Sequence, residues 1–239
     1  MQPAMNAAIV IPVYNHGPLV GAVVARALAL ALPVIVVDDG STDETAAVLA
    51  EYGGITVCTH PVNRGKGAAL LTGFAEARRR GCDWALSFDG DGQHHPEDAP
   101  ALLAAVQDGR RRLVIGRRTG MAPGRTVPWT SRFGRGFSNF WVRACGGPAV
   151  SDSQSGFRLY PLPEALDLGV RARRYQFEVE VLVRAAQAGL AVCEVPVGVV
   201  YPGPGERVSH FRPWVDFWRN SGTFSRLLGR RLIGGLRRR

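Results

Sequence analysis

The chain has 239 residues, of which 46% are hydrophobic, so it can bury a sizeable core as a single domain. Its formal charge of +9 at pH 7 predicts acidic partners such as nucleotides or anionic lipid. The four cysteines form no CxxC pair, which argues against a structural zinc site and indicates a reducing compartment. No charged n-region precedes an apolar core at the N-terminus, so we expect no signal peptide, and Arg26 and Pro33 interrupt the longest apolar run, so we expect no transmembrane helix.

Strand-like and helix-like segments alternate through the first half of the chain. The expected strands are 8–12, 34–38, 55–60, 84–89 and 113–116, and the expected helices are 19–31, 42–52, 66–80 and 97–107. Because these strands are rich in Val and Ile and alternate with helices, we expect an α/β fold with a mostly parallel central sheet flanked by helices. Ligands of such sheets bind at the carboxyl ends of the strands.

The second half begins with a break in this alternation. Residues 117–136 are dominated by Gly, Pro and Arg, so we expect a loop close to an anionic ligand. A further strand, helix and strand are expected at 155–160, 177–188 and 190–201. No repeat or low-complexity linker divides the chain, which favours one domain over residues 1–212 and a basic tail over residues 213–239.

Polar side chains follow the first two expected strands. Tyr14 and Asn15 end the first strand and have the chemistry to stack on a nucleobase and to hydrogen-bond it, although an ordinary turn explains them equally well. Asp38 and Asp39 end the second strand, and the helix-capping sequence after them does not explain two consecutive acids. Carboxylates at this place suit a base N–H and ribose hydroxyls.

The third strand leads into the sequence NRGKG at 63–67. Glycines at a helix start expose backbone N–H groups, and Lys66 adds a positive charge, so the segment is typical of anion binding. Lys66 is the only lysine among the 29 Lys and Arg residues. The spacing differs from that of a P-loop, which disfavours a P-loop ATPase.

The fourth strand ends in the sequence DGDGQ at 89–93. Two carboxylates separated by one glycine, Asp89 and Asp91, form an oxygen-rich turn that suits Mg²⁺ or Mn²⁺. The alternative is an acidic turn that starts the next helix, and a solitary motif would favour it. Polar motifs at three other strand ends favour the metal site.

The motifs IPVYN, DDGSTDE, NRGKG and DGDGQHHPED, in this order, resemble those of family 2 glycosyltransferases with the GT-A fold. The likeness is greatest to the dolichol- or polyprenyl-phosphate mannosyltransferase branch, and DSQSGFR at 152–158 and YQFEVE at 175–180 extend it over roughly residues 9–200. The resemblance implies a Rossmann-like nucleotide-diphospho-sugar transferase. It implies metal-dependent, inverting transfer from a nucleotide-diphosphate sugar to an acceptor, expected to be a polyprenyl-phosphate-like lipid at the membrane surface.

The resemblance, together with the motifs above, also assigns roles to residues. The nucleotide-sugar site would comprise Pro12, Tyr14, Asn15, Asp38, Asp39, Lys66 and Asp89. The metal ligands would be Asp89, Asp91 and Gln93. Arg158, with Arg117 or Arg118 from the loop, would meet donor or acceptor phosphates.

The need for a general base depends on the acceptor. A lipid phosphate is already anionic near pH 7, whereas a hydroxyl must give its proton to a carboxylate, for which Glu178 and Glu180 are the candidates. Positions two apart on a helix point apart, so we expect only one of them to face the site. The alternative for the pair is a solvated helix face with one internal salt bridge.

One segment departs from the mannosyltransferase branch, which has a basic, lysine-containing sequence after the last strand. Residues 201–212 contain no lysine, and Arg207, His210 and Arg212 take its place as candidate ligands of an acceptor phosphate, beside Arg118. This departure keeps a second acceptor class open, a hydroxyl of a glycolipid or saccharide. The QxxRW motif of processive family members is absent, which argues against polymer synthesis.

The tail from residue 214 to 239 is basic and amphipathic. It suits either a peripheral helix on anionic lipid at the cytoplasmic membrane face or a terminal helix packed on the domain. A second apolar stripe, Phe133, Phe137, Phe140 and Trp141, has the same two interpretations.

Two other classes of function fit part of the sequence. A nucleotidyltransferase joining a sugar phosphate to a nucleoside triphosphate would keep the fold, but DGDGQ and SGFR argue against it. A nucleic-acid-binding surface would explain the charge, but six aspartates in the strand-end motifs would repel phosphates without a metal. We therefore expect no nucleic-acid partner.

Overall fold

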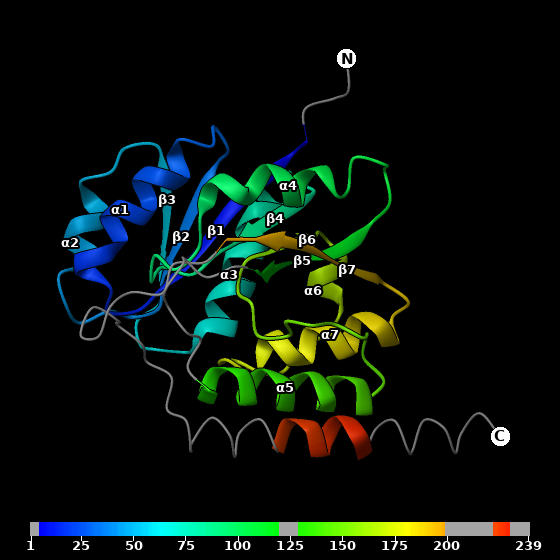
Figure 1. Cartoon of the computed structure of the whole chain (residues 1–239). Coiled ribbons are helices and arrows are strands. Elements are labelled where there is room, and N and C mark those ends of the chain that lie inside the picture. The colour runs from blue at the N-terminus through cyan, green and yellow to red at the C-terminus, as the bar shows by residue number, and fades with distance from the viewer. Residues whose placement is uncertain (1–4, 120–128, 199–221, 230–239) are drawn as a thin grey trace.

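A seven-stranded sheet forms the centre of the computed structural model, which describes residues 5–119, 129–198 and 222–229 (Figure 1). The strand order is β3-β2-β1-β4-β6-β5-β7. The strands are β1 (Ala7–Val13), β2 (Val34–Asp38), β3 (Ile55–Thr59), β4 (Trp84–Ser87), β5 (Arg112–Arg118), β6 (Arg158–Pro161) and β7 (Ala191–Val197). Strand β6 runs antiparallel to β4 and β5, and the other pairings are parallel, so the expected mostly parallel α/β sheet is confirmed.

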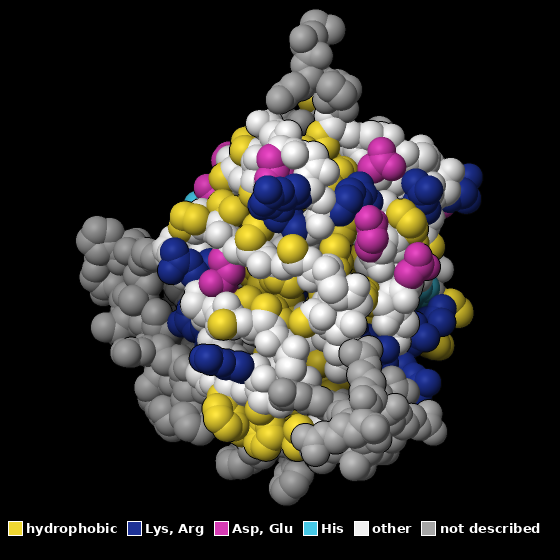
Figure 2. All heavy atoms as spheres, turned by 90° about the vertical axis from the view of Figure 1, so that its right-hand side faces the viewer, with side chains coloured by type: hydrophobic (Ala, Val, Ile, Leu, Met, Phe, Trp, Pro, Cys, Tyr) yellow, Lys and Arg dark blue, Asp and Glu magenta, His cyan; other side chains and the backbone are white. Residues whose placement is uncertain are grey.

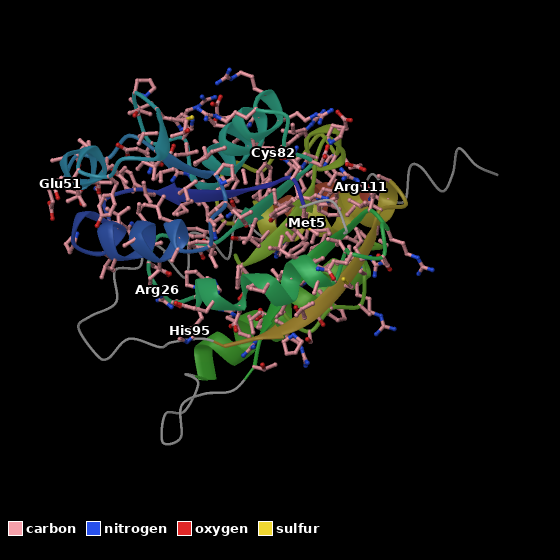
Figure 3. All side chains as sticks on the ribbon, turned by 90° about the horizontal axis from the view of Figure 1, so that it is seen from above. Met5, Arg26, Glu51, Cys82, His95 and Arg111 are labelled. Carbon is pink, nitrogen blue, oxygen red and sulfur yellow. The ribbon has the colours of Figure 1, made fainter. Side chains whose placement is uncertain are left out.

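Helices cover both faces of this sheet, as Figures 1 and 3 show. The helices are α1 (Gly17–Leu28), α2 (Thr45–Ala50), α3 (Lys66–Arg79), α4 (Ala99–Ala104), α5 (Trp129–Ala144), α6 (Glu164–Asp167) and α7 (Phe177–Gln187), with a 3₁₀ turn η1 (Pro96–Asp98) before α4. Residues of α1, α2 and α4 pack into the core on one face, and residues of α3, α5, α6 and α7 pack into the core on the other.

Side chains of β1 alternate between the hydrophobic cores on the two faces of the sheet. Ala8 and Val10 point into the core under α3, whereas Ile9 and Ile11 point into the core under α1. All seven residues of β1 are buried, because the strand is central and covered on both sides. This two-sided burial explains why the strands read as continuous apolar runs in the sequence.

Helix α5 corrects one expectation from the sequence. Residues 117–136 were expected to form a loop, but residues 129–136 are helical and continue to Ala144. Two glycines weaken the helix propensity of this segment, and packing of Phe137, Trp141 and Val142 against the core compensates for it. Within the apolar stripe, Phe137 and Trp141 therefore pack on the domain, whereas the Phe140 side chain is 64% exposed.

A helical segment at 222–229 packs below α5 in the view of Figure 1. Phe224 and Leu227 are buried, and the Phe224 ring stacks on Trp141 with ring centroids 5.9 Å apart. Arg226 pairs with Glu180 of α7 at 2.9 Å. For these residues, the expectation of a terminal helix packed on the domain is the one that the structure shows.

The remaining part of the tail lies outside the described residues, as do residues 120–128 and 199–221. Among the helices that are described, none combines the length and the apolar character needed to cross a bilayer.

Candidate active site

The predicted motifs lie at the carboxyl ends of adjacent parallel strands. Val13 at the end of β1 is paired with Asp38 at the end of β2, and Pro12 is buried beside Val37. Strand β4 lies on the other side of β1, so the DGDGQ turn follows the neighbouring strand. The fold therefore brings the motifs to one edge of the sheet, as parallel strands require.

Asn15 and Asp38 hold the loops that follow β1 and β2. The Asn15 N–H donates to Ser41 Oγ (2.9 Å), and Asn15 Oδ1 accepts the N–H of Thr42 (2.8 Å). Asp38 Oδ1 accepts the N–H of Ser41 (2.9 Å). Asn15 thus joins the two loops, whereas Asp38 stabilises the turn of its own loop. Tyr14, expected to stack on a base, is half-buried at the same edge.

Asp39 was expected to hold the nucleoside, but its carboxylate is 2% exposed and accepts hydrogen bonds from the protein. Oδ1 accepts the N–H of Arg64 (2.9 Å) and lies 2.6 Å from His60 Nδ1, while Oδ2 accepts the N–H of Gly65 (2.7 Å). His60 Nε2 in turn lies 2.9 Å from Thr72 Oγ1. Asp39 therefore fixes the 63–67 loop, and through it the start of α3.

Lys66, the first residue of α3, lies between two carboxylates. Its Nζ is 2.6 Å from Asp89 Oδ1 and also forms an ion pair with Glu178 Oε1. Burial favours a lower pKa for the Lys66 ammonium, but attraction to Asp89 and Glu178 outweighs it and raises the pKa above its usual value. Lys66, expected to bind a phosphate, is thus a protonated bridge between β4 and α7.

The pKa values of the two carboxylates in this bridge shift in opposite directions. Burial acts to raise the pKa of Asp89, yet attraction to Lys66 and other cations brings that pKa below its usual value. Burial raises the pKa of Glu178, and attraction to Lys66 offsets this only in part. Asp89 is therefore the more firmly ionised member of the pair.

The backbone of Gly156 lies close to the Asp89 and Lys66 side chains. A Cβ atom at this position would lie 2.6 Å from Asp89 Oδ2 and 2.8 Å from Lys66 Nζ, so a larger residue would displace them. Ser87 Oγ donates to the Gly156 carbonyl (2.8 Å) and holds the backbone there. The glycine of the SGFR sequence is thus explained by contact with the DGDGQ motif.

The DGDGQ turn offers oxygen ligands for a cation. Asp91 Oδ1 accepts the N–H of Gln93 (3.1 Å), and Gln93 is buried. Lys66 contacts Asp89 through Oδ1, and the carboxylate has a second oxygen, Oδ2, with which to bind an ion. Two carboxylates and one amide fit Mg²⁺ or Mn²⁺ completed by substrate phosphates. In the part of the chain that is described, no cluster of three His, Cys, Asp or Glu side chains has the arrangement of a metal site.

His94 is buried directly behind this turn. Its Nε2 lies 3.9 Å from Asp89 Oδ2, its ring packs on Phe157 with ring centroids 5.4 Å apart, and its Nδ1 has no hydrogen-bond partner within the described residues. Burial lowers the pKa of His94 to about 4, because the charged imidazolium is poorly solvated there. His94 is therefore neutral near pH 7.

The arginines expected at phosphates differ in their surroundings. Arg118 forms two hydrogen bonds of 2.8 Å to Asp152, which is fully buried, and Arg117 lies half-buried beside it at the end of β5. Arg158 is 0% exposed and donates to the carbonyl oxygens of Ser153, Ser155 and Glu178. The structure thus assigns Arg158 to holding the backbone together, rather than to the direct phosphate contact expected from the sequence.

Glu178 and Glu180 point apart, as expected, but neither lies on a solvated face, and of that alternative only the internal salt bridge, from Glu180 to Arg184, is present. Glu178 is 5% exposed and faces Lys66. Glu180 is fully buried and binds Arg184 (2.7 Å), Arg226 (2.9 Å) and the N–H of Ala172 (2.9 Å). Glu180 therefore attaches the 222–229 segment to the domain.

The loop after the DGDGQ turn is attached to both neighbouring elements. Arg26 of α1 pairs with Glu97 (2.6 Å) and lies beside His95 (Figure 3). Asp98 Oδ2 accepts the N–H of Gly198 (2.7 Å), at the end of β7. The chain continues from there toward Arg207, His210 and Arg212, which lie outside the described residues.

Sequence reasoning missed several residues around the site. His60 lies outside the quoted motifs, and His94 and Asp152 lie within quoted motifs but were given no role, so only the fold revealed their proximity to Asp39, Asp89 and Arg118. Gly156 could have been predicted to lie at the site, because it belongs to the SGFR sequence that resembles the family.

Comparison with known proteins identifies the family. The model of "Glycosyl transferase family 2" matches residues 8–162. A polyprenol monophosphomannose synthase of Mycolicibacterium smegmatis is 34% identical over 211 residues, which cover 82% of this chain and 78% of that protein. A UDP-N-acetylglucosamine–dolichyl-phosphate N-acetylglucosaminyltransferase of Methanococcus voltae is 30% identical over 213 residues, which cover 81% and 85% of the two chains.

Solved structures support the fold. Mannosyl-3-phosphoglycerate synthase from Rubrobacter xylanophilus has a TM-score of 0.67 at 20% identity, covering 98% of this chain and 75% of that one. Mannosyltransferase PcManGT from Pyrobaculum calidifontis, in complex with GDP-Man and Mn²⁺, has a TM-score of 0.56 at 17% identity, covering 85% and 59%. The fold is thus the GT-A fold expected from the motifs. The chain belongs to glycosyl transferase family 2 and is a glycosyltransferase of the hexosyltransferase class.

Proposed function

We propose that the protein is a metal-dependent, inverting glycosyltransferase that moves a sugar from a nucleotide-diphosphate sugar to a lipid-linked phosphate at the membrane surface. The observation that carries the proposal is the placement of Asp89 and Asp91 after β4, at the edge shared with the loops after β1 and β2. Two relatives are named for transfer to polyprenol or dolichyl phosphate, and one solved structure of the fold contains Mn²⁺ and GDP-Man.

The chemistry follows from the charges at the site. An acceptor phosphate oxygen bonds to the anomeric carbon from one face, and the bond to the nucleotide diphosphate breaks on the other, which inverts the carbon. The electron pair of the broken bond stays on the diphosphate. Asp89, Asp91 and Gln93 would hold a divalent ion, which would supply Lewis-acid stabilisation of that charge. Arg117, near the end of β5, would add positive potential toward phosphate oxygens.

Each acceptor class makes a different demand on the protein. A lipid phosphate brings its own anionic oxygen, so no residue has to remove a proton. A hydroxyl of a glycolipid or saccharide would need a carboxylate base. The net charge of +9 favours an anionic acceptor. We therefore propose a phosphate acceptor, with a hydroxyl acceptor as the second candidate.

The test replaces Asp91 by alanine and measures transfer of radiolabelled sugar from GDP-mannose or UDP-N-acetylglucosamine to polyprenyl phosphate with Mn²⁺. We expect Asp91→Ala to abolish transfer and to leave the unfolding midpoint unchanged. Asp108→Ala is the matched control, because Asp108 pairs with Arg112 at the other end of β5 and should leave transfer intact. Full activity of Asp91→Ala would contradict the placement of the metal.

The same assay separates the acceptors and the donors. Free polyprenol in place of its phosphate should accept no sugar, and efficient transfer to the alcohol would favour the hydroxyl alternative. Thermal shifts with GDP or UDP plus Mn²⁺ identify the donor base, because a ligand at 100 times its dissociation constant stabilises the fold by about 2.7 kcal/mol.

A further inference from the structure

We propose that Glu178 is a positioning residue and not a general base: it holds Lys66 against Asp89 and so orients the carboxylate that binds the metal. This inference rests on the metal-dependent function proposed above. It changes the role that the sequence suggested for Glu178. It also explains why position 66 carries a lysine, the only one in the chain.

The bridge joins three elements that are far apart in the sequence. Asp89 follows β4, Lys66 begins α3, and Glu178 is the second residue of α7. The Lys66 ammonium contacts a carboxylate oxygen of each acid, and all three side chains are largely buried. A change at α7 is therefore transmitted to the DGDGQ turn through one cation.

The backbone around the bridge leaves Lys66 little room to move away. A Cβ on Gly67 would lie 2.7 Å from Phe177 Cβ, and the N–H of Ala68 donates to the Arg173 carbonyl at 3.0 Å, so the starts of α3 and α7 are in direct contact. Arg158 binds the Glu178 carbonyl at 2.9 Å and fixes the backbone on the other side.

The charges explain why all three groups are needed together. Without Lys66, the two carboxylates would lose the ammonium that lies between them, and repulsion would turn Asp89 away from its present orientation. Without Glu178, Lys66 would have Asp89 as its single acidic partner and would lose the contact that directs it. A residue that orients a metal ligand in this way typically contributes 10–100-fold to metal affinity.

The same contact argues against Glu178 as a base. A general base needs an oxygen within hydrogen-bond reach of the proton that it removes. Glu178 Oε1 is taken by an ammonium group, and the side chain is 5% exposed behind Lys66. A glutamine keeps an amide oxygen that accepts from Lys66 but cannot take up a proton at neutral pH, so it separates the two roles.

The experiment compares Glu178→Gln, Glu178→Ala and wild type in two measurements. Isothermal titration with Mn²⁺ in the presence of GDP or UDP, without acceptor, reports metal affinity independently of turnover. Transfer kinetics at saturating Mn²⁺ report kcat. Glu76→Gln is the matched control, because Glu76 also lies on α3 and, among the described residues, its ion pairs are with Arg79 and Arg80 at the other end of that helix from Lys66.

We expect Glu178→Ala to bind Mn²⁺ about 10–100-fold more weakly than wild type. Glu178→Gln should recover most of that affinity and keep at least about a tenth of the wild-type kcat, and Lys66→Met should weaken Mn²⁺ binding as Glu178→Ala does. A general base predicts the reverse, an unchanged affinity with kcat about 10²–10⁴-fold lower in Glu178→Gln, and that result would overturn the inference.

Failure of the proposed function has a distinct signature. If wild-type protein transfers sugar without any divalent ion and binds no Mn²⁺, both the metal dependence and this inference are wrong. If wild type needs Mn²⁺ but Glu178→Ala and Lys66→Met bind it as tightly as wild type, only this inference is wrong. Glu178→Gln keeps the comparison possible should the alanine variant fail to fold.

Discussion

Single aspartates at the strand ends differ mainly in what surrounds them. The Asp39 carboxylate accepts hydrogen bonds from two backbone N–H groups and lies beside His60, whereas Asp89 is held through Oδ1 by one ammonium and has a second oxygen, Oδ2. A carboxylate that is already saturated by protein donors stabilises the loop that provides them. The first is thus suited to fixing a loop and the second to binding a cation.

The buried imidazole of His94 predicts a pH-dependent stability. Its pKa is about 4 in the folded protein against 6.5 ordinarily, so between these values the unfolded chain binds more protons. The free energy of unfolding therefore falls as the pH drops from about 6.5 toward 4, by about 2 kcal/mol between pH 7 and pH 5 from this group.

Urea unfolding of wild type and His94→Gln at pH 7 and pH 5 measures this contribution. We expect the wild type to lose about 2 kcal/mol more than the variant over this interval. Equal m-values would show that both proteins unfold from equally compact states. An identical pH dependence in the two proteins would mean that folding does not lower the pKa of His94.

Among the elements, the 222–229 helix depends on one buried carboxylate. Glu180 receives Arg184 of its own helix, Arg226 of the terminal segment and a backbone N–H, although it is fully buried. Removing the shared acid leaves two arginines without their partner, whereas removing one arginine leaves the other in place.

We expect Glu180→Ala to lower the free energy of unfolding by about 3 kcal/mol, as for other broken buried pairs. Arg226→Ala should cost about 1 kcal/mol or less, because the Arg226 side chain is 39% exposed and screened by water. Chemical denaturation measures both, and hydrogen exchange should show faster exchange in residues 222–229 for each. Equal losses in the two variants would contradict the central role of Glu180.

The elements also show where sequence patterns are informative. The apolar strands were predicted within a few residues, because two-sided burial forces a continuous hydrophobic run. Helix α5 was expected to be a loop over its first half, because its glycines are disfavoured in helices and its packing on α7 and the terminal segment is not visible locally. The antiparallel direction of β6 likewise follows from long-range pairing.

At the scale of the whole molecule, the net charge of +9 would attract the protein to an anionic membrane. Figure 2 shows Lys and Arg side chains interspersed with Asp and Glu over one face, with apolar side chains gathered at its lower edge. The packed 222–229 helix uses its apolar face on the domain, so the arginines beyond it are the more direct candidates for lipid contact.

We expect the protein to sediment with anionic vesicles and to lose that binding in high salt. A variant that leaves the packed helix intact tests this, with the terminal arginines replaced by alanine: Arg230, Arg231, Arg237, Arg238 and Arg239. At about 1 kcal/mol for each arginine near the surface, binding should fall at least about 10-fold. Neutral phosphatidylcholine vesicles are the control, and unchanged sedimentation with anionic vesicles would argue against the membrane contact.

The sequence alone was sufficient for the fold class, the family and the edge of the sheet at which the site lies. These follow from local patterns, since burial on two faces sets the composition of a strand and parallel strands place their following loops together. Only the tertiary structure showed that Lys66 joins Asp89 to Glu178, that Asp39 and Arg158 hold backbone groups, and that Glu180 anchors the terminal helix. The physical reason is that the same charged side chain binds a ligand or stabilises the protein according to which groups the folded chain brings within hydrogen-bond distance, and those groups lie up to 112 residues away in the sequence.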